Sequence, residues 1–116
     1  MYLKLRITIS EELKAYNIQV NAIAPGGIAT SLQDEVIAAG ELAGKEALAN
    51  AQKIKATGGT PLEKPTALAV FLASDDSKGL TGKLISAVWD DWESMSGRIS
   101  EIVSSDIYTL RRVTKV

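Results

Sequence analysis

The stretch from Ile18 to Leu32 constrains the fold of this chain more than any other. Residues Ile18 to Ala24 are apolar except for two amides, short and partly β-branched, as expected for a strand buried on both faces of a parallel sheet. Pro25, Gly26 and Gly27 end this strand, because proline has no N–H for a ladder and glycine adopts turn conformations closed to other residues. The pattern predicts a strand followed by a tight turn.

A helix is predicted directly after this turn. Thr30 and Ser31 are candidate N-caps, and Gln33 and Asp34 follow them at the spacing of a capping box. The segment is therefore interpreted as a strand, a tight turn and a helix start. In an open α/β sheet, ligands bind beyond the carboxyl ends of the strands, which makes this turn a candidate binding site.

The same residues carry a family signature. Asn21-Ala-Ile-Ala-Pro25-Gly26, with Thr30 four residues after the glycine, resembles the Asn-x-x-x-Pro-Gly-x-x-x-Thr signature of the short-chain dehydrogenase/reductase family. Other segments are similar to neighbouring parts of that family, in its order and spacing: residues 11–14, 17–21, 61–65, 71–75 and 80–85. The resemblance covers roughly residues 5 to 90 and corresponds to the C-terminal part of such an enzyme.

The resemblance implies an α/β fold, namely the C-terminal portion of a Rossmann-like doubly wound parallel sheet, with two parallel strands and helices forming an incomplete sheet. At 116 residues the chain is at most one domain. We expect residues 1–116 to form the C-terminal half of such a domain. Residues 31–60 would be a helical insert similar to the family's substrate lid, with an ordinary two-helix insert as the alternative, and residues 93–116 a C-terminal extension.

Residue patterns predict the helices of the first half. Residues 1–16 fit two interpretations: apolar and polar residues alternate as in a strand, but an apolar stripe also fits one face of a helix. The resemblance favours a helix from about Leu5 to Tyr16, which would end at Asn17 in the left-handed conformation. Residues 32–57 consist almost entirely of good helix formers. Gly40 is expected to divide this run into a short and a longer helix.

The second half is predicted to return to the sheet. Pro65 suits the first turn of a helix that runs to Ser74. We expect this helix to bury four apolar side chains: Leu68, Val70, Phe71 and Leu72. A second strand is predicted from Lys83 to Val88, so the strand–helix–strand order indicates a right-handed parallel crossover.

The last segment carries apolar residues at roughly helical spacing: Met95, Ile99, Ile102, Val103 and Leu110. It is expected to pack on the sheet or on a neighbouring subunit. Before it, Asp90 and Asp91 stand between Trp89 and Trp92. Adjacent carboxylates can act as an acid/base pair or as caps, and the cap is the favoured interpretation because neighbouring side chains usually point in different directions.

The resemblance assigns cofactor contacts to the turn. It implies that Pro25 and Gly26 pack beside the nicotinamide ring of NAD or NADP, that the backbone of Ile28 bonds the carboxamide, and that the Thr30 hydroxyl reaches the carboxamide or a phosphate. A plain N-cap is the alternative for Thr30. The resemblance also places Gly27, Ser31 and Leu32 at the substrate. It gives Asn21 a structural role, as a buried amide that ties the strand to the turn.

A complete enzyme of this family moves a hydride between a nicotinamide cofactor and an alcohol or carbonyl. Its catalytic Tyr-x-x-x-Lys has no counterpart here, because the fourth residue after Tyr2 is Arg6, and the glycine-rich cofactor motif is also missing. No catalytic residue is therefore assigned. Two hypotheses follow: a truncated dehydrogenase/reductase that is inactive by itself, or a non-catalytic remnant that serves as an association module.

Composition excludes several other functions. A net charge of −1 and the lack of any long basic run argue against nucleic acid binding. No apolar run approaches the roughly 18 residues of a membrane span, so a cytoplasmic protein is expected. Cysteine and histidine are absent, which removes disulfides, Cys/His zinc sites and thiol or imidazole catalysis, and no metal site is assigned.

The resemblance also predicts a partner. In the family, the strand that matches Ile18–Ala24 lies next to another strand that has no counterpart in this sequence. An unpaired, apolar strand edge is a template for pairing with another chain. We therefore expect a homo-oligomer or a complementary chain at this edge.

Overall fold

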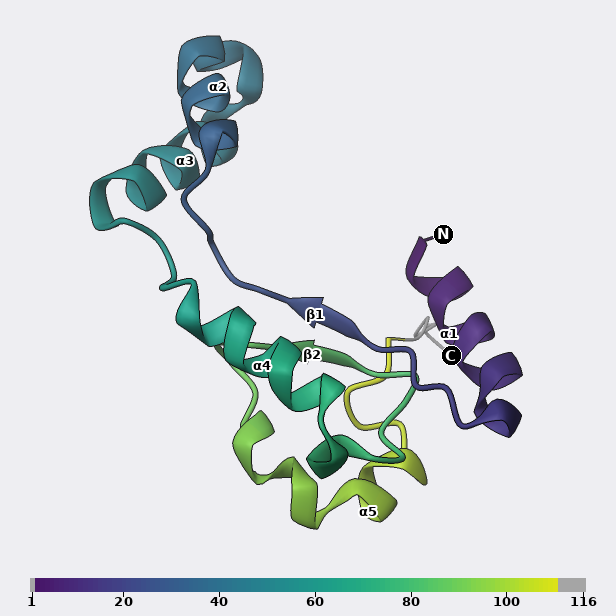
Figure 1. Ribbon diagram of the computed structural model, residues 1–116. Helices are drawn as coiled ribbons and strands as arrows, with labels where there is room; N and C mark the ends of the chain where they lie inside the picture. The colour runs from purple at the N-terminus through teal and green to yellow at the C-terminus, as the bar shows by residue number, and fades with distance from the viewer. Residues whose placement is uncertain (1, 111–116) are drawn as a thin grey trace.

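The computed structural model describes residues 2–110 as an α/β structure built on two parallel strands (Figure 1). Helices labelled η are short 3₁₀ helices. In chain order the elements are α1 (Tyr2–Leu13), η1 (Lys14–Tyr16), β1 (Ala22–Ala24), α2 (Ser31–Ala39), η2 (Gly40–Ala43), α3 (Lys45–Thr57), α4 (Glu63–Ala73), η3 (Asp75–Ser77), β2 (Leu84–Ser86), η4 (Trp92–Gly97) and α5 (Ile99–Val103).

The two strands form the predicted parallel pair. Ala22 lies opposite Leu84 and Ala24 opposite Ser86, which confirms the strand–helix–strand crossover and the incomplete Rossmann-like sheet. Both strands are shorter than predicted. Before β1, side chains take some of the positions of a regular ladder. The N–H of Val20, for example, donates to the Thr81 hydroxyl at 3.0 Å instead of to a backbone carbonyl.

The prediction that the first strand is buried on both faces is wrong for this structure. Ala22 is buried, but Ile23 and Ala24 are only half-buried, and Ile18 is 47% exposed. The physical reason is that the sheet has only two strands among the described residues, so β1 is an edge strand here.

The core lies between the sheet, α4 and the C-terminal segment. Its buried members are Leu68, Leu80, Ile85, Ala87, Met95 and Ile102. Leu68 is fully buried on α4, with Phe71 and Leu72 packed partly against the cluster, as predicted. Val70 was predicted to be buried but is 65% exposed, because a helix turns it away from the face shared by Leu68 and Leu72.

The C-terminal segment packs on the sheet within the same chain. Met95 of η4 and Ile102 of α5 have no exposed surface and contact the cluster that includes Ile85 of β2. Of the two alternatives for this segment, the structure therefore supports packing on the sheet. Helix η4 ends at Gly97, and α5 follows after Arg98.

The local helix signals are confirmed. Asn17 ends η1 in the left-handed conformation with φ of 58°, and Pro65 lies in the first turn of α4. Thr30 is the N-cap of α2, and Gln33 completes the capping box. Ser31, the other candidate cap, is instead the first residue of the helix.

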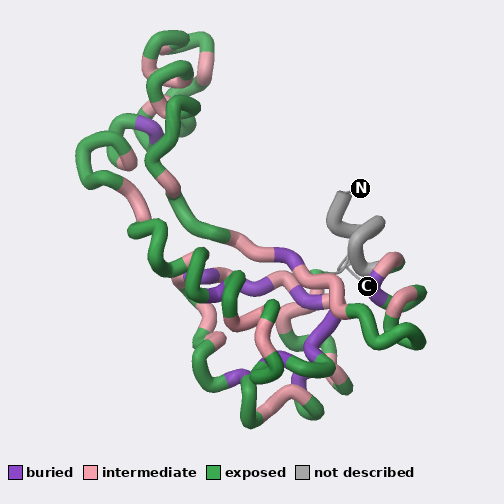
Figure 2. Tube along the Cα trace, in the orientation of Figure 1, coloured by how far each residue is buried: buried purple, intermediate pink, exposed green. Residues whose placement is uncertain are grey.

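Helices α2 and α3 form an arm that extends away from the sheet (Figure 1). Gly40 separates the two predicted helices. An exposed ion pair joins them, from Lys55 to Asp34 at 2.5 Å, and Ala51 is the buried residue of α3. The rest of the arm is largely exposed (Figure 2), and the radius of gyration, 17.0 Å, exceeds the roughly 13 Å of a compact domain of this length.

A membrane span requires a long apolar helix. None of the helices formed by residues 2–110 has the length and hydropathy to be one.

Lys83 holds the C-terminal segment onto the outer side of β2. Its ammonium group is buried and donates to the Ser105 carbonyl and the Thr109 hydroxyl, each at 2.8 Å. Burial lowers the pKa of Lys83 from its ordinary value of 10.5, and the negative charge of Asp106 offsets part of this effect.

This pKa predicts an unusual alkaline pH dependence of stability. Because the pKa of Lys83 is lower in the folded state, the buried charge destabilises the fold at lower pH, and that contribution disappears as the pH rises through the folded pKa toward 10.5. The free energy of unfolding of the wild type, measured by urea denaturation relative to Lys83→Met, is therefore expected to increase over this window. A difference that decreases with pH would contradict the assignment.

Candidate functional site

The turn after β1 is closely packed at Gly26. This glycine has φ of +93°, and a Cβ added to it would lie 2.7 Å from Thr60 Oγ1 and 2.9 Å from a methyl carbon of Val88. Any larger residue would therefore push three segments apart. They are the turn itself, the loop after α3 that contains Thr60, and the segment after β2 that contains Val88. The prediction of a glycine-dependent tight turn is confirmed.

A short backbone contact ties the arm to this turn. Ile28 forms an isolated antiparallel bridge with Gly59, and the N–H of Thr60 donates to the Gly27 carbonyl at 2.8 Å. Gly27 also packs against Ile54 of α3. The chain enters the arm through Ile28 and leaves it through Gly59, so both connections of the arm meet at the candidate site.

The predicted cofactor residues lie along one exposed strip. Pro25, Gly26 and Thr30 are exposed, and Ile28 is half-buried. The Ile28 N–H is already bonded to the Gly26 carbonyl at 3.1 Å, whereas its own carbonyl has no hydrogen bond to another described residue. The backbone group of Ile28 that is open to a ligand is therefore an acceptor, which suits the NH₂ of a carboxamide.

Thr30 serves as a cap. Its hydroxyl accepts from the Leu32 N–H at 3.3 Å and donates to Gln33 Oε1 at 3.1 Å, while its backbone N–H donates to the same oxygen at 2.7 Å. This hydroxyl therefore retains one acceptor lone pair and no spare proton. A group that donates, such as a carboxamide, can bond it without breaking the cap.

The predicted substrate residues continue the strip into the arm. Ser31 begins α2 and is exposed, as is Leu32 at 59%. Gly27 precedes them and carries the contact to Ile54 described above. The three residues therefore lie where the turn meets the arm.

Asn21 has a structural role, but it connects different elements from those predicted. Its Nδ2 donates to the Leu80 carbonyl at 2.8 Å, and its Oδ1 accepts from the Lys83 N–H at 3.1 Å. The amide thus ties the start of β1 to the loop before β2, not to the Pro25–Gly26 turn. The side chain points this way because the turn lies beyond the opposite, carboxyl end of the strand.

Gln19 repeats this arrangement and was not singled out by sequence reasoning. Its amide donates to the Ser77 carbonyl at 3.0 Å and accepts from the Gly79 N–H at 2.9 Å. The signal was present in the alternation of amides with apolar residues at Gln19 and Asn21. Side-chain amides at this spacing point to one side of an extended chain and replace the backbone partners of a short strand.

Asp90 and Asp91 have structural partners, but the favoured cap interpretation is wrong for their side chains, because Asp91 occupies the N-cap position of η4 without a side-chain cap hydrogen bond. Asp90 Oδ2 accepts from the Ser86 N–H at 2.6 Å, and Asp91 Oδ2 accepts from the Ser94 hydroxyl at 2.8 Å. The two carboxylates therefore have separate partners. Trp92 packs on Phe71 with ring centroids 5.6 Å apart, whereas Trp89 is 87% exposed.

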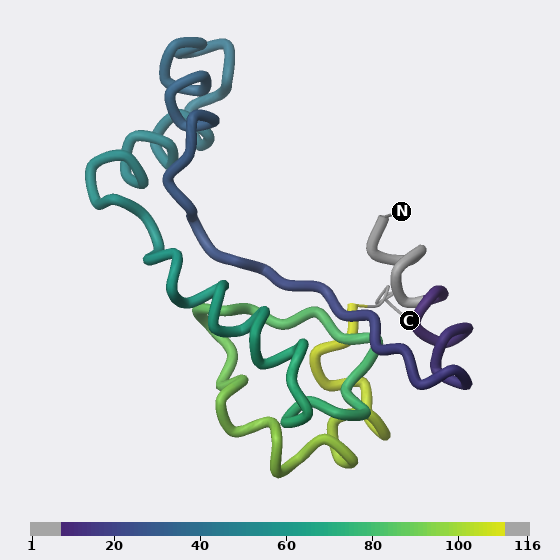
Figure 3. Tube along the Cα trace, viewed as in Figure 1, coloured from purple at the N-terminus to yellow at the C-terminus, as the bar shows by residue number. Residues whose placement is uncertain are grey.

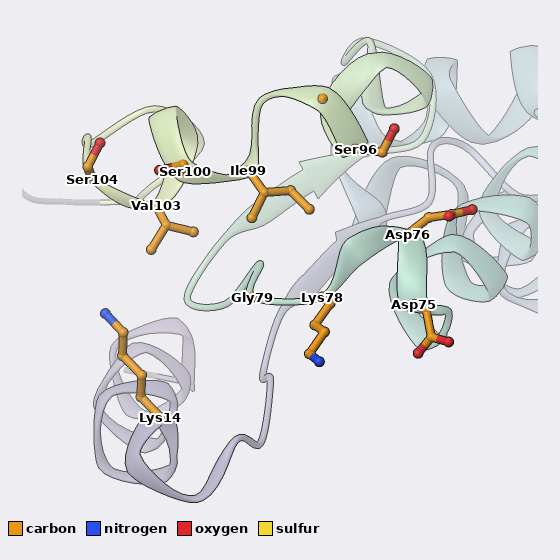
Figure 4. A pocket seen from close by; sticks show the side chains of 11 residues that line it. Lys14, Asp75, Asp76, Lys78, Gly79, Ser96, Ile99, Ser100, Val103 and Ser104 are labelled. Carbon is orange, nitrogen blue, oxygen red and sulfur yellow. The ribbon is translucent and has the colours of Figure 1, made fainter.

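Two cavities flank the sheet at opposite ends. One of about 290 Å³ is at the carboxyl end of β2, beside the Gly26 turn, and includes Val88, Asp90 and Trp92 in its lining. The other, an open cleft of about 980 Å³, is at the amino ends of the strands, with Lys14 and Lys78 on one side and Ile99 and Val103 on the other (Figure 4). No group of three or more potential metal ligands was found among residues 2–110.

Comparison with known proteins identifies the family. The family model described as enoyl-(acyl carrier protein) reductase matches residues 4–87. The chain is similar to the short-chain reductase protein NovJ of Streptomyces niveus, with 40% identity over 82 residues that cover 67% of this chain and 30% of that protein. It is also similar to momilactone A synthase of Oryza sativa subsp. japonica, with 33% identity over 72 residues. This match covers 62% of the present chain and 26% of that protein.

The chain thus spans less than a third of the length of either relative. The comparison with solved structures gave no match. The matched range of 4–87 contains most of α1, the whole β1–turn–α2 segment, the arm, α4 and β2. The order of elements, the glycine-dependent turn and these similarities agree, and the chain belongs to the short-chain dehydrogenase/reductase family.

Proposed function

We propose that this chain provides the nicotinamide end of the cofactor site of an NAD- or NADP-dependent oxidoreductase that acts on an alcohol/carbonyl pair. Turnover would require the Tyr-x-x-x-Lys and glycine-rich motifs that this sequence lacks. The observation that carries the proposal is the turn at Gly26, closely packed on Thr60 and Val88 and followed by the Thr30 cap, within the range that matches the family.

The proposed contacts follow from the groups that the turn leaves open. Pro25 and Gly26 are both exposed, and the nicotinamide ring would lie against them. The Ile28 carbonyl and the remaining lone pair of the Thr30 hydroxyl would both accept from the carboxamide NH₂. A bound cofactor would supply the hydride chemistry, and the residues of this turn would orient its ring.

The arm is proposed to act as a substrate lid. Within residues 2–110 it meets the site at the Ile28–Gly59 bridge region and the Gly27–Ile54 contact, and its surface is mostly exposed. Gly27, Ser31 and Leu32 would contact the substrate where the arm meets the turn. In domain terms, residues 31–60 would be the lid, residues 93–116 an extension, and residues 1–116 together part of one Rossmann domain.

The second candidate function is an association module without catalysis. The observation that favours it is β1, an edge strand of a two-stranded sheet among the described residues. Either a second copy or a complementary chain would cover that edge, and a catalytic role does not exclude this association.

The cofactor proposal is tested by a chimera. The segment of the Streptomyces niveus short-chain reductase that aligns with residues 18–34 is replaced by the present sequence, and cofactor-dependent turnover is measured. Thr30→Ser keeps the hydroxyl and the cap. Thr30→Asp keeps the cap, since aspartate is an equally good N-cap, but it places a carboxylate at the cofactor.

We expect the chimera and Thr30→Ser to turn over, and Thr30→Asp to raise the KM for the cofactor by about 10-fold, or roughly 1.4 kcal/mol, because its carboxylate would repel the negatively charged phosphates of the cofactor. Thermal unfolding of the three proteins should coincide, because the cap is intact in each. An unchanged KM in Thr30→Asp would show that Thr30 is only a cap. As a control, the purified 116-residue chain should oxidise no alcohol with NAD or NADP.

A further inference from the structure

Thr60 lies at the candidate site, although it is far from the turn in the sequence. The chain passes the turn as it enters the arm and passes it again as it leaves the arm, just before α4 (Figure 3). Thr60 Oγ1 would lie 2.7 Å from a Cβ built on Gly26, closer than the Val88 methyl carbon at 2.9 Å. The Thr60 hydroxyl therefore borders the glycine against which the nicotinamide ring is proposed to lie.

The backbone of Thr60 is held in place, but its hydroxyl is uncommitted. The Thr60 N–H donates to the Gly27 carbonyl at 2.8 Å, and the preceding residue, Gly59, forms the bridge with Ile28. The side chain is half-buried, and its hydroxyl forms no hydrogen bond to another residue within the 2–110 range. Because polar groups that are shielded from water normally have a partner, this fixed hydroxyl is available to a ligand.

The groups already assigned to the carboxamide are both acceptors. The Ile28 carbonyl and the remaining lone pair of Thr30 Oγ1 can accept only from the carboxamide NH₂. The N–H groups of these two residues already donate, to the Gly26 carbonyl and to Gln33 Oε1. The carboxamide oxygen therefore needs a donor from elsewhere, since a shielded oxygen without a hydrogen bond is costly.

We propose that Thr60 is a further cofactor-binding residue, whose hydroxyl donates a hydrogen bond to the carboxamide oxygen of the nicotinamide group. The proposal rests on the proposed function and adds to it a residue that the sequence signature does not contain. The carboxamide would be bound from both connections of the arm. Ile28 and Thr30, at the entry, would accept from its NH₂, and Thr60, at the exit, would donate to its oxygen.

Three mononucleotides distinguish the donor from the acceptors, because they differ only in the group that replaces the carboxamide. Nicotinamide mononucleotide has both the NH₂ and the oxygen. Its 3-acetylpyridine analogue keeps the oxygen but has a methyl group in place of the NH₂. Its thionicotinamide analogue keeps the NH₂ but has sulfur, a weak acceptor, in place of the oxygen. Each is titrated into the isotope-labelled 116-residue chain, and the NMR shifts of the turn amides give its Kd.

Thr60→Val removes the hydroxyl with little change in side-chain shape and keeps the backbone N–H. We expect it to raise the Kd of nicotinamide mononucleotide and of the acetylpyridine analogue equally, by about 5-fold, as for the loss of one hydrogen bond. The Kd of the thionicotinamide analogue should change by less than about 2-fold, because sulfur accepts weakly. Thr60→Ser, which keeps the hydroxyl, should bind like the wild type. Thr66→Val, at an exposed threonine on α4, is the matched control.

The outcomes separate this assignment from the proposed function. Equal weakening of all three ligands in Thr60→Val would show a structural role and overturn the assignment, as would three unchanged Kd values. A wild type that binds none of the three would overturn the proposed function and this assignment together. If Thr60→Val does not fold, the wild type still decides. Nuclear Overhauser effects between the Thr60 methyl protons and the pyridine ring of bound nicotinamide mononucleotide are expected, and binding at the turn without them overturns the role of Thr60.

Discussion

Replacement of Leu68 by alanine is expected to lower the free energy of unfolding by about 2–5 kcal/mol, the range for removing a buried leucine from a packed core. Leu68 has no exposed surface and lies on α4 against Leu80 and Ile85, so it joins the helix to the sheet. Domains of this kind have a total stability of roughly 5–15 kcal/mol, so the variant is expected to be largely unfolded at moderate urea concentrations.

The matched control for this variant lies on the same helix. Val70 is two residues away and 65% exposed, so Val70→Ala should change the free energy of unfolding by no more than about 0.5 kcal/mol. Urea denaturation followed by circular dichroism, at one fixed protein concentration, measures both variants. Equal effects at the two positions would show that the core is not centred on Leu68.

Gly59→Ala is expected to disconnect the arm from the candidate site. Gly59 has φ of +72°, and a Cβ added there would overlap the carbonyl oxygen of Gly27 and lie 3.0 Å from the backbone nitrogen of Ala29. Both neighbours are backbone atoms that cannot rotate away. The Ile28–Gly59 bridge and the Thr60–Gly27 hydrogen bond should therefore be lost together.

Gly58→Ala separates this packing effect from backbone strain. Gly58 also has a positive φ, +81°, but a Cβ there would meet nothing within 4 Å. The control should lose about 1–2 kcal/mol from the left-handed conformation alone, and Gly59→Ala should lose about 1–3 kcal/mol more from the overlap. Urea denaturation gives the energies, and limited proteolysis within residues 31–60 should become faster in Gly59→Ala. Equal stability of the two variants would contradict the tight approach of the arm to the turn.

These experiments address different parts of one arrangement. The core around Leu68 supports the sheet, the sheet presents the Gly26 turn, and the turn holds the arm through Gly59. A cofactor at the turn would therefore contact residues whose positions depend on β1, on Val88 after β2 and on Thr60 after α3. The site is assembled from three segments that are far apart in the sequence.

Local features of the fold were predictable from the sequence by itself. The capping box joins Thr30 to Gln33, and the left-handed end of η1 depends on Asn17 alone, so short-range interactions determine both. The parallel pairing of β1 and β2 followed from the order of strand, helices and strand. Family membership followed from the turn signature, because the residues that form the turn are also contiguous in the chain.

Only the tertiary structure decided what the long-range polar contacts do. Asn21 bonds to Leu80, 59 residues away, and the buried ammonium group of Lys83 bonds to Thr109, 26 residues away. The exposure of Val70 and the closing of the β2 edge by Tyr108 likewise depend on which face of an element meets which neighbour. No local pattern determines that register, because the partners come together only when the chain has packed. The sequence alone therefore determined the elements and the family, and packing determined which distant polar groups those elements bring together.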